Sequence, residues 1–336
     1  MAPSDETLLT IENLSVEFIS DNVSLRSVDD VSLTVRKGKT LGIVGESGSG
    51  KSVTVSTILQ LLPANARVPE GKIMYNNQDL LTLNEKELRK IRGNEIAMIF
   101  QDPMTSLNPV FTIENQLIEA IRLHQKMTKK QARDEAVRLL GLVGIKEPEK
   151  RLKLYPHEFS GGMRQRVMIA MAISSIPSLI IADEPTTALD VTVQKQIIDL
   201  LQELQMKIHT SIIFITHDLE VIAEIADDVV IMYAGEVVES GSKEQVFHHP
   251  LHPYTRLLID AIPKANKSAG RLPTIEGNVP SLADIPKGIC RFSTRIPWIP
   301  EEAHEKNPQL REVEPGHFVR CTCYKNFRLK ETGGDQ

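Results

Sequence analysis

A glycine-rich run limits the folds that are open to this chain: Gly45-Glu46-Ser47-Gly48-Ser49-Gly50-Lys51-Ser52. It fits G-x-x-x-x-G-K-[ST], a loop whose backbone N–H groups wrap the phosphates of a nucleotide. The apolar run Thr40–Val44 predicts a buried strand before the loop, and Val53–Leu62 predicts a helix after it. This order directs the unpaired N–H groups of a helix start at an anion. The sequence therefore predicts a site for ATP or GTP, the alternative being a plain glycine-rich connector.

Each part of this loop has an expected role. Lys51 would reach the β- and γ-phosphates, and the Ser52 hydroxyl would bind Mg²⁺. The backbone supplies the other phosphate contacts. The predicted ATP-binding residues are Gly45, Glu46, Ser47, Gly48, Ser49, Gly50, Lys51, Ser52 and Val53.

Composition narrows the protein classes. With 336 residues, 41% of them hydrophobic and 25% charged, the chain is typical of globular proteins and long enough for a main domain with an appendage. A net charge of −5 argues against a surface that coats nucleic acid. No apolar run approaches the roughly 18 residues of a membrane span, and the polar start is no signal peptide. All three cysteines follow residue 289, which favours a reducing cytosol.

Hydrophobic periodicity divides the chain into three parts. Strand patterns alternate with helix patterns, which predicts an α/β fold with a largely parallel sheet covered on both faces. A helical subdomain at about 102–158 interrupts this alternation, with Thr128 and Gln131 as a capping box. After about residue 250 prolines become frequent and periodicity weakens. We therefore predict an ATP-binding domain at 1–250 and an irregular C-terminal extension at 251–336.

A second motif supplies carboxylates. The apolar strand pattern before Asp183 and Glu184 delivers both side chains to the carboxyl edge of the sheet. Asp183 is suited to hold Mg²⁺, directly or through water, and Glu184 to act as general base on the attacking water. In isolation such an acidic pair is often a solvated turn. Downstream of a phosphate loop, the catalytic interpretation is the stronger one.

Two glycines open a helix after a serine in the run Phe159–Arg166, FSGGMRQR. This predicts a second helix start that can cradle an anion, although Ser-Gly-Gly alone is usually only a loop. One chain has no use for two cradles on one triphosphate. In a dimer, the cradle of each subunit can close over the nucleotide held by the other.

Taken together these motifs resemble the ATP-binding subunit of an ABC transporter, a P-loop NTPase, over about Leu8 to Val246. Six elements occur in the family's order: the phosphate loop, Gln101, the FSGGMRQR signature, Asp183-Glu184, Ala188-Leu189-Asp190, and His217 after SIIFIT. One departure is Met163, where glutamine is common. Because the backbone does the cradling, we expect little loss from it.

The resemblance implies further roles. Gln101 would contact Mg²⁺ or the attacking water, His217 would hydrogen-bond the γ-phosphate, and Asp190 would lie at the dimer seam. Phe18 is a candidate for stacking on adenine. Without the family, Gln101 and Phe18 are ordinary strand-end residues and His217 an ordinary histidine. The signature that would complete the partner's site consists of Ser160, Gly161, Gly162 and Met163, and the implied catalytic set of Glu184, His217 and Gln101.

The finer resemblance is to subunits that serve oligopeptide and dipeptide importers. It rests on MIFQDPMTSLNP (Met98–Pro109), YPHEFSGGMRQR and His252-Pro253-Tyr254-Thr255. It implies an ATPase that uses ATP and Mg²⁺ to drive peptide uptake, peripheral on the cytoplasmic face of the membrane. The implied partners are a paralogous ATPase subunit, two permeases and an extracellular substrate-binding protein. The alternatives are the same role in a nickel or glycan importer, or a soluble ABC-type ATPase.

The tail of this subfamily commonly carries four cysteines that hold an iron–sulfur cluster. Cys290 and Cys321 match the first and last, Ile296 occupies the second position, and the third falls near Ala303 or His304. Cys323 is an extra cysteine. Because two thiolates are missing, we expect a tail inherited without its cluster. Zinc bound by the three cysteines and His304 is the alternative.

Overall fold

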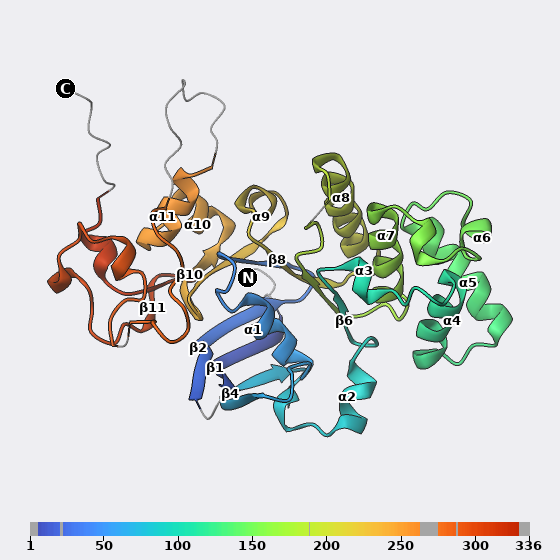
Figure 1. Cartoon of the computed structure of the whole chain (residues 1–336), viewed down its shortest axis with the longest axis horizontal. Coiled ribbons are helices and arrows are strands. Elements are labelled where there is room, and N and C mark those ends of the chain that lie inside the picture. The colour runs from blue at the N-terminus through green and yellow to red at the C-terminus, as the bar shows by residue number, and fades with distance from the viewer. Residues whose placement is uncertain (1–5, 21–22, 188, 263–274, 287, 329–336) are drawn as a thin grey trace. The chain divides into compact units, whose positions relative to one another are not determined.

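The computed structural model describes residues 6–20, 23–187, 189–262, 275–286 and 288–328 (Figure 1), so Ala188 of the Ala188–Asp190 motif lies outside the described residues. The chain folds into two compact units. Unit 1 is built mainly from residues 79–215, together with 35–40. Unit 2 is built mainly from residues 9–34, 41–78 and 216 onward. The predicted division near residue 250 stays a prediction.

Three parallel strands form the sheet of unit 1. In order they are β6 (Ile96–Ile99), β7 (Leu179–Asp183) and β8 (Ser211–Thr216). The register pairs Ile99 with Ala182 and Asp183 with Ile215. Strands β7 and β8 are buried along their whole length, which explains why they are apolar runs without alternation. The parallel strands all end at the same edge, where their polar residues follow.

Helices make up most of the rest of unit 1. Helices α4 and α5 pack on each other and on α7, and Figure 1 shows them grouped with α6. The predicted helical content of 102–158 is confirmed, and so is the capping box, in which Thr128 Oγ1 accepts the N–H of Gln131. The helices are α2 (Glu85–Ile91), α3 (Pro103–Ser106), α4 (Ile113–His124), α5 (Lys129–Leu142), α6 (Pro148–Arg151), α7 (Gly161–Ala172) and α8 (Val191–Ile208), with 3-10 turns η1 (Leu80–Thr82) and η2 (Pro156–Glu158).

Unit 2 contains an antiparallel sheet that precedes and follows the phosphate loop in the chain. Its strand order is β2-β1-β4-β5, and β1 pairs with β4 from Leu9–Tyr75 to Phe18–Ala66. Irregular register between Glu12 and Glu17 marks the bulged part of β1. The strands are β1 (Thr7–Ser20), β2 (Val23–Arg36), β4 (Ala66–Tyr75) and β5 (Gln78–Asp79).

A second group of strands in unit 2 carries the phosphate loop. Strand β3 (Thr40–Val44) pairs in parallel with β9 (Asp228–Tyr233), and β10 (Glu236–Ser242) returns antiparallel to β9. The buried strand predicted before the loop is therefore confirmed. Helix α1 (Lys51–Ile58) follows the loop, ending earlier than the predicted Leu62. Helices α9 (Leu219–Ile225), α10 (Lys243–His248) and α11 (Pro253–Asp260) complete this part.

The described residues of the C-terminal extension are largely irregular, and two short strands tie them to the fold. Strand β12 (His317–Arg320) pairs with β10, and β11 (Leu310–Glu314) pairs with β12, both antiparallel. Three 3-10 turns connect the rest: η3 (Ser293–Arg295), η4 (Glu301–Ala303) and η5 (Cys323–Lys325). Periodicity missed the strands because four or five residues are too few to show alternation.

Among the described residues, none of the helices combines the length and the apolar composition that crossing a bilayer requires.

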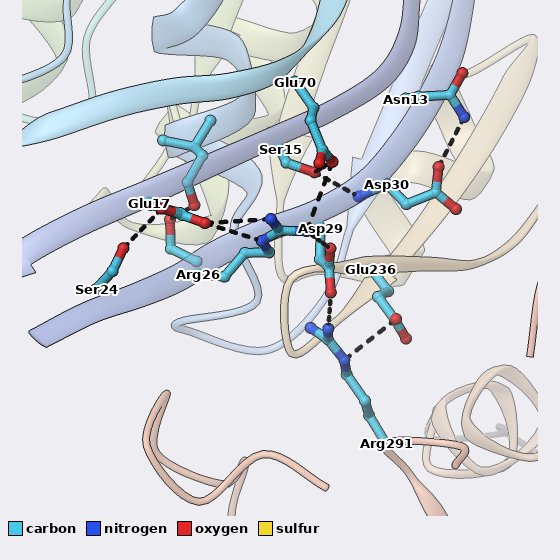
Figure 2. Close-up of polar contacts among 12 residues, drawn as sticks. Asn13, Ser15, Glu17, Ser24, Arg26, Asp29, Asp30, Glu70, Glu236 and Arg291 are labelled. Atoms are coloured by element: carbon cyan, nitrogen blue, oxygen red, sulfur yellow. Dashed lines mark hydrogen bonds and ion pairs between the residues drawn. The ribbon is translucent and has the colours of Figure 1, made fainter. Parts of the chain in front are cut away.

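An arginine of the extension is clamped between two carboxylates (Figure 2). Arg291 forms ion pairs with Asp29 in the middle of β2 and with Glu236, whose Oε1 lies 3.2 Å from the arginine Nε. All three side chains are mostly shielded from solvent, and burial raises the pKa of Glu236. Beside them Arg26 joins Asp29 to Glu17 on β1. Breaking a shielded pair from one side leaves the other charge without compensation.

We predict that Arg291→Ala lowers the free energy of unfolding by about 2 kcal/mol. Glu236 loses its nearer cation and keeps only Arg320 at 3.8 Å, while Asp29 keeps its pair with Arg26. Urea unfolding followed by the fluorescence of Trp298, the single tryptophan, measures the effect on the extension itself. The matched control is Arg89→Ala, whose pair with Glu85 is exposed and whose loss should cost under about 1 kcal/mol. Equal urea midpoints for the Arg291→Ala and Arg89→Ala proteins would contradict a stabilising role of the Arg291 ion pairs.

Candidate nucleotide site

The phosphate loop folds so tightly that its first residue has no space for a side chain. A Cβ on Gly45 would lie 2.2 Å from the Met232 carbonyl oxygen and 2.6 Å from Ser49 Oγ. A hydrogen bond from the Gly235 N–H to the Ser49 carbonyl oxygen, 3.0 Å long, holds the loop close to the residues that follow β9. The loop is thus pressed against the end of β9, and this fixes the direction of its backbone N–H groups.

Lys51 lies inside the loop that it is expected to serve. Its Nζ donates to the carbonyl oxygens of Gly45 at 2.7 Å and Glu46 at 3.0 Å, and its side chain is buried. Ser52, the next residue, is exposed at the start of α1. The ammonium group is therefore held by backbone carbonyl oxygens of the loop, and the oxygens of a bound phosphate can replace them as its partners.

Two residues far along the chain hold the loop from outside. The Tyr254 hydroxyl accepts the Glu46 N–H at 3.0 Å, and Arg295 donates to the Glu46 carboxylate at 2.8 Å. Burial of Tyr254 raises the pKa of its hydroxyl, which keeps it neutral. Arg295 is itself fixed, because it also donates to the carbonyl oxygens of Glu276 and Gly277. The extension thus contributes directly to the shape of the phosphate loop.

Unit 1 contains the acidic pair. Asp183 ends β7 and is buried, and Glu184 follows it with a backbone φ of 44°. A non-glycine residue in this left-handed region is strained, so the surrounding contacts must hold it there. One of these is the hydrogen bond from the Glu184 N–H to the Ile215 carbonyl, 3.0 Å long. The turn aims the Glu184 side chain away from the strand direction.

Two donors orient the Glu184 carboxylate. Gln101 Nε2 lies 3.0 Å and Thr187 Oγ1 lies 2.9 Å from the same oxygen, Oε2. With both donors on one oxygen, the rotation of the carboxylate is fixed. Gln101 and Glu184 thus lie side by side in unit 1, while the contact expected of Gln101 with Mg²⁺ or the attacking water stays a prediction. Thr187 is a contact that the sequence analysis missed. Its position three residues after Glu184 was the available signal.

The signature helix begins with a capped, exposed N-terminus. Ser160 is the N-cap of α7, and its Oγ accepts the Met163 N–H at 3.4 Å. A Cβ on Gly162 would lie 2.6 Å from Val193 Cγ1, so glycine is needed for α7 to pack on α8. Asp190 caps α8 by accepting the Val193 N–H at 3.0 Å. Both helix starts remain accessible, which suits a surface that meets another molecule.

The remaining predicted residues lie as follows. His217 is exposed directly after β8, and Phe18 is half-buried on β1 opposite Ala66. Their contacts with nucleotide stay predictions. In the extension, Cys290, Cys321 and Cys323 are all buried as free thiols. The analysis of the sequence missed Arg295 and Tyr254 as supports of the loop, although Tyr254 belongs to the His252–Thr255 motif.

Comparison with known proteins agrees with this arrangement. The family model of the ABC transporter matches residues 28–187, and that of the oligopeptide/dipeptide transporter C-terminal region matches residues 238–298. The dipeptide transport ATP-binding protein DppD of Bacillus subtilis is 50% identical over 320 residues, covering 95% of this chain and 93% of that protein. The chain belongs to the ABC transporter ATP-binding proteins. The oligopeptide transport ATP-binding protein OppD of Escherichia coli is 49% identical, over 94% of this chain and 93% of its own length.

Solved structures place the fold in the same family. The dimeric post-hydrolysis state of the ATP-binding cassette MJ0796, bound to ADP and Pi, is 27% identical with a TM-score of 0.64. The match covers 70% of this chain and 99% of that one. The protein cbiO1 of Clostridium perfringens, part of the ABC transporter complex cbiONQ, is 25% identical with a TM-score of 0.62, over 73% and 92% of the two chains. This ABC protein therefore has the fold of a P-loop NTPase.

We predict that Arg295 and Glu46 act on nucleotide binding as a coupled pair. Arg295→Gln and Glu46→Gln should each weaken binding of a fluorescent ATP analogue about fivefold, and the double variant should be no worse than either, because the coupling energy is about 1 kcal/mol. Lys325→Gln, an exposed cation of the same extension, should leave the affinity unchanged. Additive losses in the double variant would mean that the ion pair does not shape the loop.

Proposed function

We propose that this chain is the ATP-hydrolysing subunit of a peptide importer, coupling ATP binding and hydrolysis to uptake of peptides across the cytoplasmic membrane. The observation that carries the proposal is the similarity to dipeptide and oligopeptide transport ATP-binding proteins, about half of all residues along nearly the whole chain. It extends to the C-terminal region, where a match specific to oligopeptide and dipeptide transporters begins at residue 238.

ATP and Mg²⁺ are the implied ligands, and the side chains of the chain suit them. The hydroxyl of Ser52, the carboxylate of Asp183 and the amide of Gln101 offer the oxygen donors that Mg²⁺ prefers. Bound Mg²⁺ would neutralise charge that develops on the transferred phosphate. The tight turn at Gly45 supports the phosphate site independently, since a side chain there is excluded by the backbone.

The residues of the chain divide the hydrolytic work. Lys51 holds the terminal phosphates, and His217 donates a hydrogen bond to the γ-phosphate. Glu184 accepts a proton from the attacking water, in an orientation fixed by the donors Gln101 and Thr187 on its other oxygen. Gln101 also lies two residues before α3, at the start of the helical segment. A movement of Gln101 when the γ-phosphate is lost can therefore displace α3 and α4. Phe18 supplies a ring for adenine.

Two such subunits close head to tail over ATP, with Ser160–Met163 of one completing the site of the other and Asp190 at the seam. The exposed, capped start of α7 suits this role. Closure performs work only because ATP favours the closed pair over the open one, since a ligand of equal affinity shifts no equilibrium. Loss of the γ-phosphate removes the bridge, and the pair reopens.

The partners follow from this mechanism. One nucleotide domain per chain requires a second ATPase subunit, which we propose to be a paralogue. Two membrane-spanning permeases hold the pair peripherally at the cytoplasmic face, and an extracellular binding protein delivers the peptide. Nickel and glycan importers would use the same machinery, but the named relatives that carry this C-terminal region are dipeptide and oligopeptide proteins.

We predict that Glu184→Gln reduces the rate of ATP hydrolysis at least about 100-fold in the assembled transporter, because the general base is lost while the phosphate contacts remain. ATP affinity should be unchanged, and uptake of labelled dipeptides and oligopeptides into vesicles should stop. Glu119→Gln, an exposed carboxylate on α4, is the matched control. Hydrolysis by the Glu184 variant at the wild-type rate excludes the assigned base. Uptake of nickel or glycans in place of peptides excludes the substrate class.

We also predict that a photo-crosslinking amino acid placed at Ser160 labels the other ATPase subunit when ATP is bound, and does so weakly without it. Mass spectrometry of the product should locate the crosslink in the partner's phosphate loop. The same amino acid at Lys86, exposed on α2, is the control and should give no such product. A crosslink confined to the same chain, or to a permease, contradicts the shared nucleotide site.

A further inference from the structure

Four potential metal ligands meet in the C-terminal extension. One ligand atom from each of Cys290, His304, Cys321 and Cys323 lies within 4.8 Å of each of the others. They come from three separate parts of the extension: the loop before η3, the end of η4, and the turn after β12. The three thiols are buried and free, and 92% of His304 is shielded from solvent. The four ligands are therefore brought together by the tertiary fold and not by close spacing in the sequence.

The residues present do not fit the iron–sulfur cluster that the family resemblance implies. Such clusters use four thiolates, and the chain offers three cysteines in all. At the second expected position stands Ile296, a fully buried residue with no ligand atom. His304 lies near the third, and Cys323 has no counterpart in that pattern. Two cysteines of the cluster pattern are therefore absent, but two other potential ligands, His304 and Cys323, lie close to the remaining two.

The spacing of the ligand atoms suits a single ion. Around one tetrahedral zinc, with Zn–S of about 2.3 Å and Zn–N of about 2.0 Å, ligand atoms stand roughly 3.5 to 4 Å apart. A set already within 4.8 Å needs only small movements to reach that geometry. In a [4Fe–4S] cluster each thiolate binds a different iron, so the protein sulfurs stand further apart. Three sulfurs and one imidazole nitrogen are a ligand set of structural zinc sites.

His304 supplies an independent sign of a missing partner. Its Nδ1 is buried, and among the described residues it has no hydrogen-bond partner. Burial of an unpaired polar nitrogen is costly, since water is lost and nothing replaces it. Coordination of a metal ion through Nδ1 would remove this cost.

Neighbouring groups are placed to support thiolates. Cys321 has a φ of 71°, and this turn brings the Cys323 N–H to 3.4 Å from Cys321 Sγ. His252 Nδ1 accepts the Tyr254 N–H, so a neutral His252 carries its proton on Nε2, which lies 3.8 Å from Cys290 Sγ. Donors of this kind orient metal ligands and stabilise their charge. The His252–Thr255 motif thereby contacts both the group of four potential metal ligands, through His252, and the phosphate loop, through Tyr254.

We propose that Cys290, His304, Cys321 and Cys323 bind one zinc ion, which staples the three parts of the extension together. The site is structural, because all four positions of the tetrahedron are filled by protein and none is left for a substrate. In an extension with few regular elements, one bound ion would add a crosslink to the packing that buried side chains such as Phe292 and Val319 already provide. The proposal does not depend on the substrate or the partners of the transporter.

The test is the metal content of the full-length chain, purified without oxygen and with any affinity tag removed. Elemental analysis should find about one zinc per chain that survives passage over a chelating resin, with iron and acid-labile sulfide near zero. In the His304→Ala and Cys323→Ser variants, the zinc content per chain should in each case fall at least about tenfold. His248→Ala, an exposed histidine at the end of α10, should retain it.

A second measurement needs no variant to fold. Cobalt added to the metal-free wild-type chain should give the visible ligand-field bands of a tetrahedral thiolate site, and equimolar zinc should remove them. Iron with equal sulfide would show that the extension keeps a cluster with an unusual ligand set. A wild-type chain that binds neither zinc nor cobalt would show that the four side chains are no metal site. Either result overturns the proposal.

Discussion

The structure depends on how closely the phosphate loop lies against the end of β9. At Gly45 a single added carbon would occupy the space of the Met232 carbonyl, so backbone meets backbone there without intervening side chains. That approach turns the N–H groups of the loop inward and encloses Lys51. Anion binding by a polypeptide of net charge −5 is possible because these local dipoles, not the overall charge, set the potential at the site.

Charged side chains of the extension reinforce this arrangement. Arg295 contacts the loop through Glu46, while Arg291 and Arg320 contact Asp29 and Asp30, two adjacent residues in the middle of β2. Each arginine is largely buried and makes several directed contacts, which an exposed pair does not. An extension with weak hydrophobic periodicity can thus be held firmly by a few planar cations.

How much of the fold and of the site could be predicted depends on how far apart in the sequence the interacting residues lie. The strand Thr40–Val44, the capping box at Thr128 and the acidic pair at the end of β7 are local patterns, and the structure confirms their placement. The hydrogen bond between Gln101 and Glu184 was not predicted, because the two residues are 83 positions apart and the resemblance assigned each of them a separate role. The contacts Glu46–Arg295 and Cys290–His304 leave no local pattern. Strands β11 and β12 were missed because they pair with β10 and with each other, over residues too few to show a period.

The dependence of the phosphate loop on Arg295 bears on how such proteins exchange parts. A chimera that joins the first 250 residues to a foreign C-terminal region severs contacts to Glu46, Asp29 and Asp30 at once. A graft can restore them only if it brings guanidinium groups at the matching places. A junction between the nucleotide-binding fold and its C-terminal extension therefore has to preserve these ion pairs if the two parts are recombined.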